Sequence, residues 1–323
     1  MTGRVVARWR AGALLLAVGL LAAACGGGDD GGGGSTGGGG TQLSGAINID
    51  GSSTVAPLSE AAAELFQQAN PGVRVTVGTS GTGGGFEKFC AGETDISDAS
   101  RQIEADETQA CQAKGIKYEE VQVANDGLSV VVNNENTWAQ CLTVAQLKTI
   151  WDKGSKVNNW NQVDPSYPNE PLKLFGAGTD SGTFDYFTGA INGEEGRSRS
   201  DYSATEDDNV TVTGVSGAKG GLGYFGLSYL EENQGKIKGV QVDGGGGCVA
   251  PSTATVQDGS YTPLSRPLFI YPSDAALQRP EVKAFVEFYV NNYQKIAEDA
   301  LFVPLTEAQA AEAKQKIAQL AAS

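Results

Sequence analysis

The sequence contains no histidine, and this absence removes several common kinds of catalytic and metal site. Histidine is the side chain that most often transfers protons near neutral pH, and it provides the base in serine and cysteine hydrolases. A Ser-His-Asp triad, a Cys-His dyad, a histidine general base and a histidine-ligated zinc ion are therefore excluded. We expect a protein that is not an enzyme and that has no metal site and no cofactor.

Basic residues are also scarce. The chain has 23 Lys and Arg residues against 38 Asp and Glu residues, which gives a formal net charge of -15. Surfaces that bind nucleic acids or anionic membranes need clustered positive charge. We therefore expect no nucleic-acid partner, and any anion that the chain binds must be held by a local site.

The sequence has little that could span a membrane. The apolar run over residues 11–24 has 14 residues, whereas a membrane-spanning helix needs about 20. Three arginines precede the run, and small residues end it directly before Cys25, which predicts a signal peptide over residues 1–24. This junction resembles the lipobox of bacterial lipoproteins, although Ala22 stands where Leu is usual. The resemblance implies that Cys25 carries lipid; the alternative is a plain secretory signal.

Glycine dominates residues 25–44, and this composition predicts a flexible tether after Cys25. The remaining cysteines form an even number in a chain that we expect to be exported, and none of them forms a Cys-x-x-Cys pair. Such a set predicts two disulfides rather than a metal site. Spacing alone leaves three pairings open among Cys90, Cys111, Cys141 and Cys248.

From residue 46 onward, short apolar runs alternate with helical patterns. Strands are expected at 46–49, 73–77 and 173–175, each followed by a helix, and two apolar runs flank an Asn-Asp-Gly sequence at 125–127. Two amphipathic helices, over 281–296 and 307–320, are expected to close the chain. Strands that alternate with helices indicate an α/β protein with mainly parallel sheets.

Three of the expected strand-to-helix connections, at 51–57, 78–85 and 176–183, combine glycine with hydroxyl residues. Backbone N–H groups at a helix start lack intrahelical partners and face the positive end of the helix dipole, so they bind anions. Ser53, Thr54, Thr82, Ser181 and Thr183 would add neutral donors. The alternative is that Ser53, Ser80 and Asp180 are ordinary helix caps.

Two enzyme motifs are incomplete in these segments. The 78–85 segment lacks the Lys-Ser/Thr pair of a P-loop, and the Asp-Ser-Gly sequence at 180–182 has no histidine to activate Ser181.

A carboxylate and a guanidinium lie close together in residues 95–101, where Asp98 precedes Arg101 by three positions. Arginine binds oxyanions through two parallel bonds, and a carboxylate beside an anion is favourable only if that anion carries a proton. The pair suits hydrogen phosphate; the alternative is a surface ion pair or turn.

Together these segments resemble PstS, the family of phosphate-binding proteins that serve bacterial Pst ABC transporters. The resemblance rests on residues 51–57, 78–89, 95–101, 143–151, 179–187 and 206–210, and it extends from about residue 46 to the C-terminus. It implies a two-lobed α/β periplasmic-binding-protein fold of type II. Lobe one would comprise 45–125 and 263–323, and lobe two 126–262, with two hinge crossings near 125–127 and 264–268.

The resemblance also implies a ligand set. Matching positions suggest that Asp98 accepts the phosphate proton, and that the other ligands are Ser53, Thr54, Thr82, Ser181, Gly182 and Thr183. Some family members carry a ligand arginine four residues before the Ser-Gly-Thr sequence, where this chain has Ala177. Ser100 and Arg101 are expected to supply that contact instead.

The implied lobes favour one pairing of the cysteines, Cys90 with Cys111 and Cys141 with Cys248, because each bond then lies within one lobe. The resemblance implies a monomeric extracytoplasmic phosphate receptor that is anchored by lipid alone and serves the permease of an ABC importer. The alternatives are a receptor for another oxyanion, such as sulfate, and a secreted phosphoester hydrolase. The missing histidine argues against the hydrolase.

Overall fold

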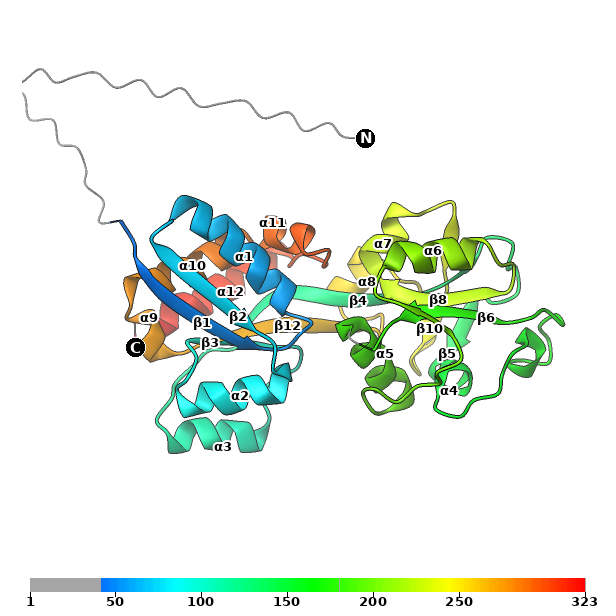
Figure 1. The fold of residues 1–323 in the computed structure, drawn as a ribbon, viewed down its shortest axis with the longest axis horizontal. Coiled ribbons are helices and arrows are strands. Elements are labelled where there is room, and N and C mark those ends of the chain that lie inside the picture. Colours follow the sequence, from blue (N-terminus) through cyan, green and yellow to red (C-terminus); the bar gives the residue numbers. More distant parts are fainter. Residues whose placement is uncertain (1–41, 180, 323) are drawn as a thin grey trace, which may run out of the picture. The chain divides into compact units, whose positions relative to one another are not determined.

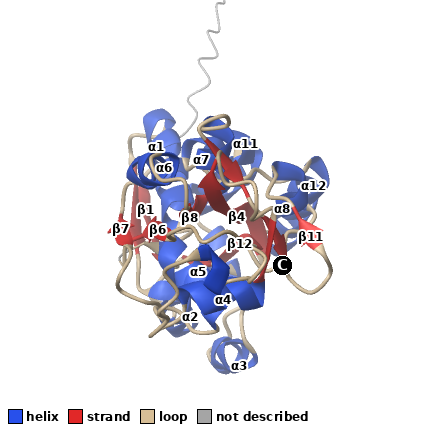
Figure 2. Ribbon diagram, turned by 90° about the vertical axis from the view of Figure 1, so that its right-hand side faces the viewer, coloured by secondary structure: helices blue, strands red, loops and turns tan. Residues whose placement is uncertain are grey.

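The computed structural model describes residues 42–179 and 181–322 (Figure 1). The predicted signal peptide at 1–24, Cys25 with its expected lipid, nearly all of the predicted 25–44 tether, and Asp180 lie outside the described residues. The α/β class is confirmed, because strands alternate with helices along the chain. Figure 2 shows helices on both sides of the strands.

The main sheet is mixed and continuous, and its strand order is β2-β1-β3-β12-β4-β8-β6-β7, with β9 also paired to β4. Pairs toward its two ends are parallel, whereas β12 and β4 are antiparallel to their neighbours. The strands are β1 (Gly45–Gly51), β2 (Val73–Gly78), β3 (Ile96–Ala99), β4 (Val121–Asn133), β6 (Lys173–Ala177), β7 (Ser203–Thr205), β8 (Gly221–Gly226), β9 (Ile237–Gly239) and β12 (Ser265–Pro272). A smaller sheet has the order β11-β10-β5, formed by β5 (Cys141–Thr143), β10 (Gln241–Asp243) and β11 (Cys248–Val249).

The helices cover these sheets and mostly follow the strands. They are α1 (Ala56–Ala69), α2 (Gly81–Ala91), α3 (Ala105–Ala113), α4 (Val144–Trp151), α5 (Gly182–Asn192), α6 (Asp208–Ser216), α7 (Leu227–Glu232), α8 (Thr253–Gln257), α9 (Asp274–Leu277), α10 (Pro280–Asn291), α11 (Tyr293–Asp299) and α12 (Glu307–Leu320), with a 3-10 helix at Trp160–Gln162. The helix expected over 281–296 is instead divided between α10 and α11, which meet at Asn292.

Strands β4 and β12 run side by side between the two groups of elements in Figure 1. The Asn-Asp-Gly sequence at 125–127 lies inside β4, where Asn125 pairs with Pro267 and Asp126 with Arg266. The two apolar runs that flank it therefore belong to one strand. Pairing with β12, together with the two backbone hydrogen bonds between Asn125 and Val303, outweighs the local turn preference of these residues, because buried backbone groups need partners.

Buried side chains gather in separate clusters along the chain. One extends from Leu128 to Leu264 and adds Val303, and it contains the stacked rings of Phe187 and Tyr224, 3.8 Å apart. Another joins residues 47–124 to residues 268–320 through α1, α10 and α12. A smaller cluster surrounds Phe86 between α2 and β12. Each cluster is packed from aliphatic and aromatic side chains, which supply most of the favourable free energy of folding.

The glycine-rich segment differs from expectation. Residues 78–85 were expected as a loop before a helix at Phe86, but α2 already begins at Gly81. The glycines allow this helix to lie close to β1, since a Cβ on Gly85 would come within 2.5 Å of the Gly51 Cα. This close approach explains why helix-disfavouring residues are found in a helix.

Both expected disulfides are present in the described residues. Cys90–Cys111 joins α2 to α3, and Cys141–Cys248 joins β5 to β11. The preferred pairing agrees with the structure. Among the residues described, no cluster of acidic or cysteine side chains is arranged to hold a metal ion. The helices within the described ranges are all too short or too polar to cross a membrane.

Candidate anion-binding site

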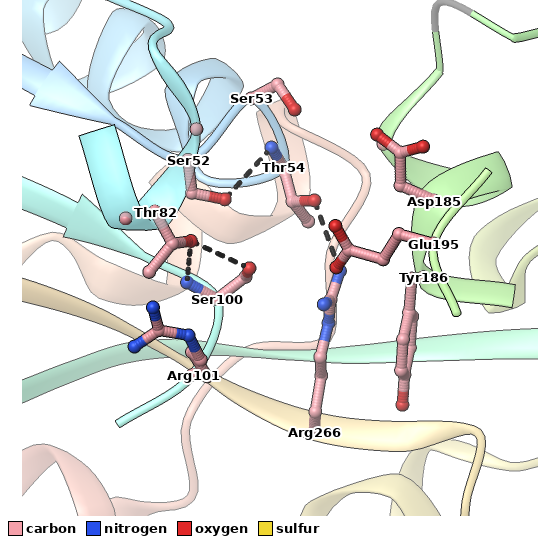
Figure 3. Close-up of a pocket in the computed structure, with 13 residues that line it drawn as sticks. Ser52, Ser53, Thr54, Thr82, Ser100, Arg101, Asp185, Tyr186, Glu195 and Arg266 are labelled. Carbon is pink, nitrogen blue, oxygen red and sulfur yellow. Dashed lines mark hydrogen bonds between the residues drawn. The ribbon is translucent and has the colours of Figure 1, made fainter. Parts of the chain in front are cut away.

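The candidate site is a cavity of about 310 Å³ at the edge of the main sheet. Strands β1 and β3 are parallel neighbours, and their carboxyl ends meet at this edge, where Gly51 pairs with Asp98. Ligand sites of open α/β sheets form at such strand ends. The cavity is lined by Ser52, Ser53, Thr54, Gly81, Thr82, Gly83, Ser100, Arg101, Gly182, Asp185, Tyr186, Glu195 and Arg266 (Figure 3).

Three helices contribute their first residues or the residues just before them. The β1–α1 connection supplies Thr54, the first turn of α2 supplies Thr82, and the first residue of α5 is Gly182. These segments approach one another closely, since a Cβ on Gly182 would come within 2.7 Å of the Thr54 Oγ1. Neutral N–H and O–H donors therefore surround the cavity, and free N–H groups at helix starts attract anions.

Hydrogen bonds hold the hydroxyl groups in place. Thr82 Oγ1 accepts a bond from the Ser100 backbone N–H at 3.2 Å and lies 3.1 Å from the Ser100 hydroxyl. The Thr54 N–H donates to Ser52 Oγ at 3.2 Å. The hydroxyls of Thr82 and Ser100 thus form a fixed pair at the wall of the cavity.

Most of the residues suggested by the sequence come together here. Six of the suggested residues line the cavity, namely Ser53, Thr54, Thr82, Ser100, Arg101 and Gly182. Ser181 is instead the cap of α5, with its Oγ accepting from the Thr183 N–H at 3.2 Å. Thr183 faces a neighbouring cavity of about 180 Å³. The cap of α5 is therefore Ser181, a residue that was expected as a ligand and that the cap alternative did not name.

Neither Ser53 nor Ser80 caps a helix through its side chain. The residue before α1 is Val55 rather than Ser53. Ser80 precedes α2 but makes no capping bond through its side chain. Its hydroxyl donates to Asp50, which also pairs with Lys88 at 2.6 Å.

Asp98 is not among the residues that line the cavity. Its side chain is fully buried, and Oδ1 accepts a bond from the Ser59 hydroxyl at 2.9 Å. Its other oxygen, Oδ2, has no hydrogen-bond partner among the described residues. Burial raises the pKa of the Asp98 carboxyl to about 8, and the nearby charges of Asp50 and Glu60 add to the rise. In this structure the neutral acid is therefore the favoured form near pH 7, and its role toward a ligand stays a prediction.

The two arginines of the cavity are both paired with carboxylates. Arg101 holds Glu107 through two parallel bonds of 2.8 Å, and its Nε lies 3.3 Å from Glu104. Arg266, on β12, donates from Nε to Asp126 at 3.1 Å and from Nη2 to Thr54 Oγ1 at 3.1 Å. Its guanidinium also lies over the Tyr186 ring, 3.7 Å from the ring centre.

Acidic groups share the cavity with these arginines. Asp185 and Glu195 both line it, and burial, followed by the charge of Glu195, raises the pKa of Asp185. Glu107 and Asp126, the partners of the two arginines, bring the number of carboxylates at the cavity to four, compared with two guanidinium groups. An anion must therefore be bound largely by neutral donors and helix starts.

Sequence reasoning missed Arg266, Asp185, Tyr186 and Glu195. A signal for Arg266 was available, because it is the lone charged residue of its strand, at the second expected crossing, 264–268. Asp185 and Glu195 gave no comparable signal, since acidic residues on and after a helix are usually solvent-exposed.

The fold and this cavity are those of a solute-binding protein. A family model described as the PBP superfamily domain matches residues 36–292. The chain is 50% identical over 262 residues to protein SphX of Synechococcus elongatus, covering 80% of this chain and 77% of SphX. It is 41% identical over 277 residues to the phosphate-binding protein PstS of Staphylococcus saprophyticus, covering 84% of each.

A solved structure agrees with these matches. The crystal structure of a possible phosphate binding protein from Planctomyces limnophilus is 49% identical and superimposes with a TM-score of 0.83, covering 86% of this chain and 99% of that one. The chain therefore belongs to the PstS family of phosphate-binding proteins within the PBP superfamily.

Proposed function

We propose that this protein is an extracytoplasmic receptor for inorganic phosphate that delivers its ligand to the permease of an ABC importer. The observation that carries the proposal is the cavity of hydroxyl groups and helix starts, in a chain 41% identical to a phosphate-binding protein. Proteins of this family bind substrates for transporters and are not enzymes. The hydrolase alternative is therefore set aside, and a receptor for another oxyanion is the alternative left to test.

The ligand would be bound between two lobes that close on it. The separation of the large hydrophobic clusters supports lobes at 45–125 plus 263–323 and at 126–262. Strands β4 and β12 would be the two crossings between them. A ligand that contacts loops of both lobes binds the closed form more tightly, so binding drives closure and presents a surface that the permease can recognise.

Replacing Thr82 with alanine should weaken phosphate binding by about 1 to 3 kcal/mol, because a buried anion loses a hydrogen bond that it cannot replace. Thr82 also orders Ser100, so the variant loosens two donors at once. Calorimetric titration with phosphate measures the change. Thr79→Ala is the matched control, because Thr79 is exposed and does not line the cavity. Equal affinities for both variants would place the ligand elsewhere.

The lipid anchor at Cys25 is a separate proposal, supported by the lipobox-like sequence before it. A Cys25→Ser variant should move from the membrane fraction to the soluble or secreted fraction, because acyl chains would provide the retaining force. Fractionation followed by immunoblotting measures this. If the unmodified protein is already entirely in the soluble fraction, the anchor is refuted.

A further inference from the structure

Arg101 and Arg266 both line the cavity, but their contacts differ. Arg101 turns the planar edge of its guanidinium onto Glu107 through two bonds, and its Nε approaches Glu104. This arrangement uses the fork that would otherwise bind an oxyanion. Its side chain is also 38% exposed, so water competes for its remaining donors.

Arg266 is more buried and less fully paired. Its side chain is 16% exposed. The hydrogen bonds described for it use the Nε proton and one Nη2 proton, which leaves three of the five guanidinium N–H donors for another acceptor. Figure 3 shows the guanidinium directed toward Thr54, at the centre of the labelled side chains.

Contacts from three separate elements fix this position. Asp126 on β4 holds one edge, Thr54 after β1 holds another, and the Tyr186 ring on α5 covers one face. An arginine held in this way loses little further side-chain entropy when it binds an anion. The positive charge of Arg266 is therefore held beside the β1–α1 connection and the start of α5.

From these contacts we infer that Arg266, rather than Arg101, is the cationic ligand of the bound anion, and that Asp126 limits how much positive charge it offers. The inference rests on the proposed phosphate-receptor function, because it names a ligand of that same site. Ala177 stands where some family members carry a ligand arginine, so this chain needs another source of positive charge. Arg266, on β12, is that source.

The test compares substitutions of the two pair members in the full-length protein, with inorganic phosphate as the probe. Arg266→Gln should lower phosphate affinity by about 10- to 100-fold, the range for a lost hydrogen bond to a charged group. Asp126→Asn should act in the opposite direction and raise affinity for phosphate and for sulfate, because a nearby negative charge is removed. Arg101→Gln should cause a smaller loss than Arg266→Gln.

Arg279→Gln is the matched control, since Arg279 pairs with Asp95 and Glu281 away from the cavity and its replacement should leave affinity unchanged. If Arg266→Gln does not fold, Arg266→Lys keeps the charge but not the three contacts, and an intermediate loss of phosphate affinity is expected.

A purely structural ion pair would give parallel losses of affinity in Arg266→Gln and Asp126→Asn, and this result would overturn the inference. A larger loss for Arg101→Gln would also overturn it. Failure of the unmodified protein to bind phosphate would instead refute the proposed function.

Discussion

Sulfate should compete with phosphate for this protein at least about 10⁴-fold more weakly than arsenate does. A site built to pair with a ligand hydroxyl can reject an analogue without one by about 10⁴ to 10⁵. Phosphate and arsenate keep at least one proton near pH 7, whereas sulfate is fully ionised. Competition titrations against a constant phosphate concentration measure the ratio.

The physical basis is the acidic lining of the cavity. Asp185 and Glu195 can accept a hydrogen bond from a protonated oxyanion, but they repel an anion that has no proton to donate. Replacing both, as Asp185→Asn with Glu195→Gln, should strengthen sulfate binding and reduce the discrimination. Glu194→Gln is the matched control, because Glu194 is exposed and does not line the cavity.

Two outcomes would contradict this explanation. Equal competition by sulfate and arsenate in the unmodified protein would show that the site does not read the ligand proton. Full discrimination in the double variant would remove Asp185 and Glu195 from this role. The next candidate would be Asp98, whose Oδ2 has no partner among the described residues.

Asp98→Asn should make the protein progressively more stable than the unmodified protein as the pH rises from about 4 to about 8. The Asp98 carboxyl has a pKa of about 8 in the folded protein, against roughly 3.9 in an unfolded chain. Between these values the unfolded chain releases a proton that the folded protein keeps. Folding stability therefore falls with pH in this window, by at most about 1.4 kcal/mol per pH unit.

The asparagine variant lacks this titration. The difference in unfolding free energy between the two proteins should widen through the window and become constant above pH 8. Urea unfolding at several pH values in phosphate-free buffer measures it, with the exposed Asp106→Asn as a control for the substitution itself. A difference that does not change between pH 4 and pH 8 would show that Asp98 is ionised in the folded protein.

The fold class and the loops that line the cavity could be predicted from local sequence patterns. Alternating strands and helices indicated the fold class, and glycine with hydroxyl residues at helix starts indicated the loops that now line the cavity. These features depend on neighbours in the sequence, so they can be predicted without the fold. The disulfide pairing needed more, because it depended on the lobes that the family resemblance implied.

Features that depend on distant residues were missed. The Asn-Asp-Gly sequence at 125–127 is extended because β12 pairs with it, and β12 lies about 140 residues further along the chain. Arg266 reaches the cavity only because the same pairing brings it beside Asp126 and Thr54. The first turn of α2 was expected as a loop but is helical, and there Gly85 lies close against Gly51 of β1. Apart from the lone charge of Arg266 in its strand, the local sequence gives no signal of these contacts.

The most direct test of the account is a calorimetric titration of the purified, phosphate-free protein with inorganic phosphate. We predict saturable binding with one phosphate per chain and a dissociation constant in the micromolar range or below, which corresponds to about 8 kcal/mol or more of binding free energy. Absence of binding at millimolar phosphate, or tighter binding of sulfate than of phosphate, would contradict the assignment of this protein as a phosphate receptor.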